Sequence, residues 1–307
     1  VAAPIQESKK VVSTSEATKR TDVKAENVEP TKSQPTKAVA SAVPSPVVAA
    51  QVASPKKATT ILYQPAEGEG VFSIGENKQV VFASGNLRYA QSTGTWDFAE
   101  NQYDYIGEDN LSGSELADKI DLFGWSGSVC NNFGVSTSNT LNDYSGSFVD
   151  WGSKQIGSDD PNTWRTLTND EWEYLLNTRP NASSLKGVAQ VNGVNGLVFL
   201  PDNWTCPSGV TFTPGFYSEY SVEAYGQHQT FTAEQWSKLE SAGAVFLPSV
   251  GNRYGLAVYY VQCDAYYWSA TEYNDYIARC FYFESDKAKM ERYTRSNGYP
   301  VRLVKNL

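Results

Sequence analysis

Residues 164–174, Trp-Arg-Thr-Leu-Thr-Asn-Asp-Glu-Trp-Glu-Tyr, contain every element of an N-terminal helix capping box. Thr168 can accept a hydrogen bond from the third helical residue, and Glu171 can reach back to the backbone of Thr168. Leu167, before the cap, and Trp172, inside the helix, can close over it as a hydrophobic staple. The segment therefore predicts a helix that begins after Thr168 and buries Trp172 in the core.

The same arrangement recurs at Thr232, where Gln235 can act as the reciprocal partner of the cap. Trp236 and Leu239 follow at helical spacing, so both are expected to anchor the helix to the core. Gly243 can end this second helix. The two capping boxes are expected to mark the two main helices of the chain.

Several segments read as strands. Residues 79–83 and 86–89 alternate apolar and polar side chains on either side of Gly85. Residues 196–201 and 243–248, Gly-Leu-Val-Phe-Leu-Pro and Gly-Ala-Val-Phe-Leu-Pro, are nearly identical and continuously apolar, which indicates burial on both faces. We expect two central strands under the same packing constraint; an internal duplication is the alternative. The expected fold class is α+β.

The first 60 residues differ in kind from the rest of the chain. They contain no Phe, Trp or Tyr, and six of the 14 prolines fall among them, so they cannot bury a core. Repeated Pro-Thr-Lys at Pro30 and Pro35 favours a polyproline-biased spacer. The sequence therefore predicts a disordered Pro/Ala/Lys-rich linker over residues 1–60 and one compact domain over residues 61–307.

Charge and hydropathy exclude some partners. The chain has 25 basic and 34 acidic residues, and nine of the basic and five of the acidic ones lie in the first 60 positions. The domain therefore has 16 basic and 29 acidic residues. A domain so acidic, with scattered basic residues, argues against nucleic acid as a partner. No apolar run approaches the roughly 18 residues of a membrane span. Because the numbered chain starts at Val1, we expect that a leader was removed and that the protein is exported to the cell surface.

The sequence contains few of the motifs that are typical of enzymes or of metal-binding proteins. The cysteines show no CxxC spacing, and we favour free thiols over a disulfide, whose pairing the sequence leaves open among Cys130, Cys206, Cys263 and Cys280. His228, the one histidine, falls on an expected loop without a Ser or Cys motif beside it. Oxygen-rich residues 159–162 precede the first helix, which disfavours calcium-dependent sugar binding. We expect no catalytic residues, no metal and no cofactor.

Tyrosines crowd the C-terminal part of the chain, where ten of the 19 lie between residues 251 and 299. Tyrosine covers contact area at low entropic cost, as in antibody paratopes, and polar residues interleave with these rings. The alternative is a run of strands whose tyrosines are half-buried. Our candidate ligand-binding residues are Tyr254, Val258, Tyr260, Asp264, Tyr266, Tyr273, Asn274, Asp275, Tyr276, Arg279 and Tyr282.

The period of two within residues 278–283 divides this segment between two faces. Phe281 and Phe283 fall on one side, and Cys280 and Tyr282 on the other. We expect the phenylalanines to face the core and Tyr282 to face the ligand.

Several of these motifs carry a resemblance to a known fold. Residues 164–174 resemble the W-R-L-P-T-E-A-E-W-E-Y segment of the formylglycine-generating, or sulfatase-modifying-factor, branch of the C-type lectin fold, and residues 298–304 are similar to its final strand. Residues 267–273, with 281–283 and the Val-Arg at 301–302, resemble more closely the FISUMP-type surface proteins of gut and related bacteria and the variable proteins diversified by retroelements. The resemblance covers roughly residues 71–307 and implies a C-type-lectin-like domain of short, mostly antiparallel strands.

The resemblance also implies a variable recognition region. Randomised template adenines convert Asn codons into those for Tyr, Asp, Ser, Cys, Arg, Ile, Leu or Val, a set that includes all the candidate residues. Trp268, Ser269, Phe281 and Phe283 would then be the fixed scaffold. Lys287, Met290 and their charged neighbours depart from the pattern, which puts the region after Ser285 in doubt as a variable segment.

The expected function is non-enzymatic recognition of a protein or glycan ligand on another cell or on a phage or host surface. An adhesin-like subunit of a surface appendage is one alternative. A degenerate enzyme of the sulfatase-modifying type is the other, although Cys263 and Cys280 lie too far apart for that branch's closely spaced cysteine pair.

Overall fold

The computed structural model describes residues 65, 66 and 68–307, so the linker predicted over residues 1–60 lies outside the described residues. The described part of the chain is a mixed structure of short, mostly antiparallel strands and few helices. The strands are β1 (Phe72–Gly75), β2 (Lys78–Phe82), β3 (Leu87–Ala90), β4 (Thr95–Phe98), β5 (Leu111–Ser112), β6 (Glu115–Leu116), β7 (Lys119–Ile120), β8 (Arg165–Thr166), β9 (Lys186–Val191), β10 (Val194–Phe199), β11 (Thr230–Phe231), β12 (Val245–Pro248), β13 (Asn252–Tyr254), β14 (Ala257–Tyr259), β15 (Ala265–Asn274), β16 (Ile277–Glu284), β17 (Lys287–Thr294) and β18 (Leu303–Asn306).

Helical segments are short in the described residues. The α-helices are α1 (Asn169–Glu173), α2 (Ala224–His228) and α3 (Ala233–Ser241), and a π-helical turn, η5 (Tyr174–Thr178), continues α1. The remaining turns are of the 3-10 type: η1 (Gly107–Asn110), η2 (Asn131–Gly134), η3 (Leu141–Tyr144) and η4 (Trp151–Ser153).

Both capping boxes are confirmed. Thr168 accepts a hydrogen bond from the backbone N–H of Glu171, whose carboxylate accepts one from the N–H of Thr168. Thr232 and Gln235 form the same reciprocal pair at the start of α3. The tryptophan of each helix is buried, as predicted. Local side-chain chemistry therefore fixes where both helices begin.

Helix α2 was not predicted, because it lacks a capping box. Its N-cap residue Glu223 forms no side-chain cap bond, and only the Ser221 hydroxyl, which accepts from the Ala224 N–H at 3.1 Å, marks its start. It places His228 at the C-terminal end of a helix, so the expectation of a loop is wrong at this position. The His228 ring nitrogen Nε2 lies 3.2 Å from the backbone oxygen of Thr213.

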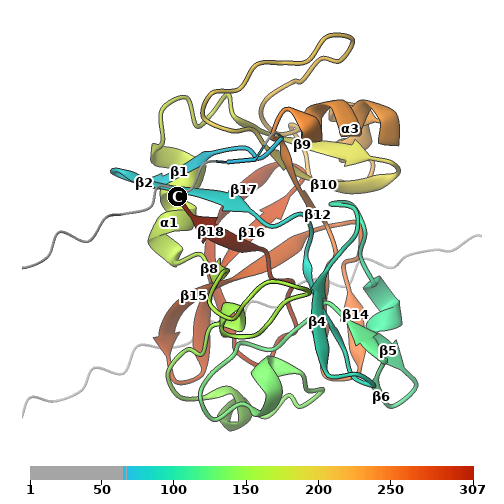
Figure 1. The fold of residues 1–307 in the computed structure, drawn as a ribbon. Helices are drawn as coiled ribbons and strands as arrows, with labels where there is room; N and C mark the ends of the chain where they lie inside the picture. The colour runs from blue at the N-terminus through green and yellow to red at the C-terminus, as the bar shows by residue number, and fades with distance from the viewer. Residues whose placement is uncertain (1–64, 67) are drawn as a thin grey trace, which may run out of the picture. The chain divides into compact units, whose positions relative to one another are not determined.

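The ends of the described chain meet in one sheet of order β1–β2–β18–β8. The C-terminal strand β18 pairs antiparallel with β2, with Val304 opposite Phe82, and Figure 1 shows the C-terminus beside these N-terminal strands. The predicted strands around Gly85 are present as β2 and β3, and they belong to different sheets. A Cβ at Gly85 would lie 2.4 Å from the backbone oxygen of Ala99, so the chain passes there only with glycine.

The two nearly identical apolar segments are neighbours in a second sheet, of order β11–β9–β10–β12. Strands β10 and β12 pair antiparallel, with Leu197 opposite Leu247 and Val198 opposite Phe246. The leucines enter one hydrophobic cluster, and Val198 and Phe246 enter another. The predicted burial on both faces is confirmed, and it explains why both strands are continuously apolar.

A third sheet, β15–β16–β17, carries the tyrosine-rich segment. Phe281 and Phe283 point into one core cluster, where Phe281 stacks on Trp172 with ring centroids 4.9 Å apart and planes 12° from parallel. Cys280 and Tyr282 point into a second cluster on the opposite face. The predicted period of two is therefore correct, but both faces of this part of the sheet are covered.

Candidate functional site

Three of the predicted binding residues are buried: Asp264, Tyr266 and Tyr282. The expectation that they face a ligand is wrong. The Tyr266 ring lies 4.8 Å from that of Tyr282 and 4.8 Å from that of Tyr299, within an aromatic cluster that includes Trp268. Loops from outside the tyrosine-rich segment cover this face of the sheet, and local periodicity gives no sign of them.

The hydroxyls in this cluster have partners inside the protein. Tyr266 donates to Asp264 Oδ2 at 3.3 Å, and Tyr282 donates to Glu284 Oε2. Burial raises the pKa of Tyr266 and Tyr282 above the ordinary phenol value, and nearby carboxylates raise it further. Burial likewise raises the pKa of Tyr299. These tyrosines are therefore neutral core residues whose polar tips are paired.

The other predicted residues reach solvent at two hairpins. The first tyrosine group surrounds the β13–β14 hairpin and the turn after it, and consists of Tyr254, Leu256, Val258, Tyr259 and Tyr260. The second tyrosine group lies at the β15–β16 turn and consists of Tyr273, Asn274, Asp275, Tyr276 and Arg279. Val258 and Arg279 are half-buried, and the others are exposed. Our candidate residues did not include Leu256 or Tyr259, although both lie in the tyrosine-rich segment.

The turn that holds the first tyrosine group is fixed by hydrogen bonds. Tyr260 and Gln262 adopt left-handed backbone angles, with φ of 61° and 65°. The Gln262 side chain donates to the Tyr105 hydroxyl at 2.9 Å and accepts from the Asn195 backbone N–H at 2.7 Å. These hydrogen bonds hold the left-handed backbone of the turn from which the Tyr260 side chain extends.

Asn274 fixes the turn of the second tyrosine group. Its side-chain oxygen accepts hydrogen bonds from the backbone N–H groups of Tyr276 and Ile277, at 3.0 and 2.9 Å. Such an Asx turn orders the chain without burying the neighbouring side chains. Tyr273 and Tyr276, on either side of it, are each 46% exposed.

Residues 139–146 lie beside the first hairpin and are linked to the second through Arg295. Buried Arg295 donates to the backbone oxygens of Tyr144 and Gly146 and also to that of Asn274, beside the second tyrosine group. At the first tyrosine group, a Cβ on Gly255 would lie 3.8 Å from the Asn139 side-chain nitrogen. The two groups are therefore braced by common supporting structure.

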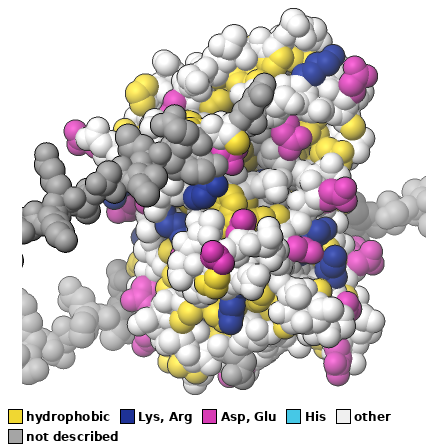
Figure 2. Space-filling view, in the orientation of Figure 1, with side chains coloured by type: hydrophobic (Ala, Val, Ile, Leu, Met, Phe, Trp, Pro, Cys, Tyr) yellow, Lys and Arg dark blue, Asp and Glu magenta, His cyan; other side chains and the backbone are white. Residues whose placement is uncertain are grey.

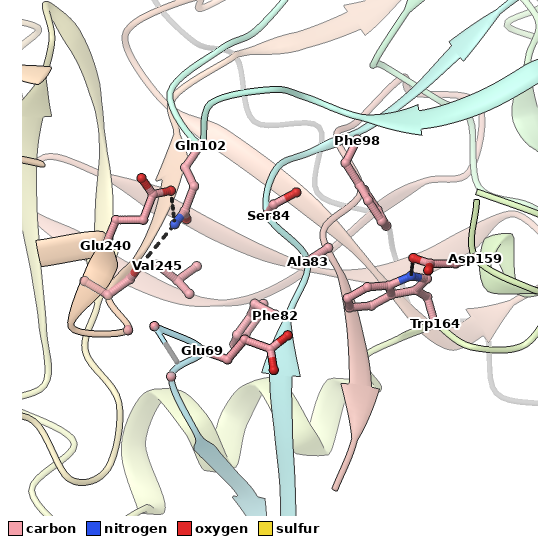
Figure 3. A pocket seen from close by; sticks show the side chains of 14 residues that line it. Glu69, Phe82, Ala83, Ser84, Phe98, Gln102, Asp159, Trp164, Glu240 and Val245 are labelled. Carbon is pink, nitrogen blue, oxygen red and sulfur yellow. Dashed lines mark hydrogen bonds between the residues drawn. The ribbon is translucent and has the colours of Figure 1, made fainter. Parts of the chain in front are cut away.

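A separate pocket of about 310 Å³ has no residue of the tyrosine groups in its lining, and Figure 3 shows the side chains that line it. Phe82, Phe98 and Trp164 contribute aromatic surface to it, and Glu69, Asp159 and Glu240 contribute carboxylates. Phe98 and Trp164 meet edge to face at 5.2 Å, and the Trp164 indole N–H donates to Asp159 at 2.8 Å. The pocket joins segments far apart in the sequence, and our sequence reasoning did not find it.

Gln102 fixes the polar side of this pocket. Its amide nitrogen donates to Glu240 at 2.8 Å and to the Ala244 oxygen at 3.1 Å, while its oxygen accepts from the Phe246 N–H at 2.7 Å. Fully buried Arg302 lies behind it, and burial lowers the pKa of this guanidinium to about 10. Aromatic walls with carboxylates at the rim suit a small ligand that carries hydrogen-bond donors.

The described part of the chain has few side chains that could form a metal site or a reactive thiol site. It contains no group of three or more His, Cys, Asp or Glu side chains placed to hold a metal ion. None of the four cysteines, all of which lie in the described part of the chain, forms a disulfide. Cys280 is buried in the core, and burial raises the pKa of Cys130 to about 11.

Comparison of the chain with protein-family models, curated proteins and solved structures finds no match. Among the described residues, no helix has the length and apolar character needed to cross a membrane. On the face drawn in Figure 2, acidic and basic side chains are interspersed among neutral ones.

Proposed function

We propose that this protein is a non-enzymatic recognition protein with a C-type-lectin-like domain, and that the two exposed tyrosine groups bind a protein or glycan ligand. The observation that carries the proposal is the exposure of Tyr254, Tyr260, Tyr273 and Tyr276 on turns that hydrogen bonds hold in place. Rigid aromatic side chains on ordered turns lose little entropy on binding, which is why binding surfaces use them.

The proposed surface is smaller than the one expected from the sequence. It retains Val258, Asn274, Asp275 and Arg279 beside the four tyrosines and adds Leu256 and Tyr259, while Asp264, Tyr266 and Tyr282 belong to the core. Every member of this surface, Tyr259 included, is Asn itself or a residue type that randomised Asn codons can encode. Retroelement diversification of these positions, on a domain displayed at the cell surface, is therefore part of the proposal.

The two alternatives have less support. An appendage subunit would contact a neighbouring subunit through the same tyrosine-rich face, without help from strand addition at the edge strand β17, which carries Lys287, Lys289 and Glu291. Charged side chains on an edge strand oppose such pairing. A sulfatase-modifying type of enzyme needs two adjacent reactive thiols, whereas Cys280 is buried and burial also raises the pKa of Cys263.

A binding array of purified surface proteins and glycans tests the proposed function. We expect saturable binding by the full chain that is lost when Tyr273 and Tyr276 are both replaced by serine, or when Tyr254 and Tyr260 are. Binding that both double variants retain in full would remove the proposal. For diversification, the expected finding is a near-identical template repeat and a reverse-transcriptase gene beside the coding sequence.

A further inference from the structure

Two arginines lie directly opposite each other at the second tyrosine group. Arg279 on β16 is the register partner of Arg292 on β17. Both guanidinium groups lie against the same aromatic ring, with their central carbons 5.1 and 4.6 Å from the centroid of Tyr273. Three strands of one sheet thus bring two positive charges together around one exposed tyrosine.

These arginines differ from the others in the described residues. Arg88, Arg165, Arg179 and Arg295 each form an ion pair with a carboxylate, and Arg253 and Arg302 are fully buried. Within residues 68–307, neither guanidinium of the opposed pair has a carboxylate within 4.0 Å or a hydrogen bond to a protein acceptor. Each guanidinium carries five N–H donors, so the pair offers many donors to an external acceptor.

The arrangement costs stability in the absence of an anion. Like charges directly opposite on neighbouring strands repel, and the attraction of each guanidinium to the Tyr273 ring only partly offsets this. An oxyanion between them would satisfy N–H donors and remove the repulsion at the same time. Arginine forks match the planar, two-oxygen geometry of a carboxylate particularly well.

We propose that Arg279, Arg292 and Tyr273 form a clamp for a single carboxylate, supplied by an acidic side chain of a protein partner. This inference rests on the proposed function and names the chemistry of its ligand. Glu272 and Asp275 flank the ring in the sequence, and Glu272 pairs with Arg295 instead of with the clamp. These two acids and the net acidity of the domain oppose a dense polyanion such as a sulfated polysaccharide.

Acetate is the direct probe, measured on the full chain by NMR of the arginine Nε–H groups at constant ionic strength. We expect saturable shifts at Arg279 and Arg292 and none at Arg165, whose carboxylate partner is Glu171. Arg279→Gln or Arg292→Gln should weaken acetate binding about tenfold, the effect of losing one charged hydrogen bond. The absence of saturable shifts at the two arginines would overturn the clamp. Inorganic phosphate binding more than tenfold tighter than acetate would overturn the assignment to a carboxylate.

Thermal stability separates a binding role from a structural one. Arg292→Gln should leave the Tm unchanged or raise it, and Arg292→Glu should raise it by pairing with Arg279 across the strands. Arg165→Gln is the matched control, because it breaks an ion pair and should lower the Tm. A fall in Tm for Arg292→Gln as large as that of the control would show that the pair stabilises the fold by itself and would contradict the proposal.

The failures of the two proposals can be distinguished. If acetate does not bind and the array still detects a ligand that depends on the tyrosines, the clamp is wrong and the proposed function stands. If acetate binds while substitutions at the tyrosines leave capture of the array ligand unchanged, the two arginines hold a carboxylate, but the proposed function and the assignment of that carboxylate to the array ligand are both wrong.

Discussion

Tyr266 stacks on Tyr299, with ring centroids 4.8 Å apart and planes 14° from parallel. Both residues belong to the tyrosine-rich segment, and both are buried. The segment therefore has two roles in one structure: some of its tyrosines build an aromatic core, and others extend from two hairpins into solvent. Replacing a tyrosine with serine should therefore change the free energy of unfolding at the buried positions but not at the exposed ones.

Replacing Tyr266 with serine should lower the free energy of unfolding by about 3–5 kcal/mol, as for other large buried aromatics. The ring contacts Tyr282 and Tyr299, so its loss leaves a cavity. Tyr276→Ser is the matched control, because that side chain is exposed and should change stability by about 0.5 kcal/mol or less. Denaturant unfolding measures both; equal effects would mean that the two environments have been assigned wrongly.

Trp172→Ala should cost about 3–5 kcal/mol, because the indole is fully buried and stacks on Phe281. Thr168→Ala should cost about 1 kcal/mol, since it removes only the helix cap. Urea titration of the two variants checks this order. A larger loss at Thr168 than at Trp172 would contradict the packing described for α1.

Acid should weaken the fold partly through Glu171. Burial by itself would raise the pKa of this carboxyl, but hydrogen bonds from Arg165 and Thr168 outweigh it and lower the pKa below 4.5. The ionised form therefore stabilises the fold above about pH 4.5, and that contribution is lost as the pH falls through the lower folded pKa. Glu171→Gln should accordingly have a shallower decrease in stability between about pH 5 and 3. An unchanged acid limb would rule out this contribution.

Alkali should distinguish the buried tyrosines spectroscopically. Because burial raises the folded pKa of Tyr266, Tyr282 and Tyr299, their neutral form stabilises the protein below the ordinary phenol pKa of about 10, and this contribution is lost above it. We expect these three to ionise only as the protein unfolds. An absorbance titration in which every tyrosine ionises before the circular dichroism changes would show that they are accessible.

The elements that could be predicted depend on local chemistry. Thr168 and Thr232 mark helix starts because the cap and its partner lie three residues apart. The alternation of Phe281 and Tyr282 was predictable because it follows from strand geometry. What Tyr282 faces was not predictable, since the cluster that covers this face of the sheet also contains side chains from distant parts of the chain, such as Phe123 and Trp125. The pocket lined by Gln102 was missed for the same reason.

The central claim is that the exposed tyrosines are the binding surface, and the most direct test is ligand affinity at matched stability. The full chain would be compared with a variant in which Tyr254, Tyr260, Tyr273 and Tyr276 are serine, with Tyr220→Ser as a control for an exposed tyrosine outside the segment. With the Tm of all three proteins nearly equal, the fourfold variant should lose at least about 4 kcal/mol of binding free energy, because two or more aromatic anchors contribute about 2 kcal/mol each. The control should bind like the original protein. A fourfold variant that folds normally and binds with unchanged affinity would contradict the account.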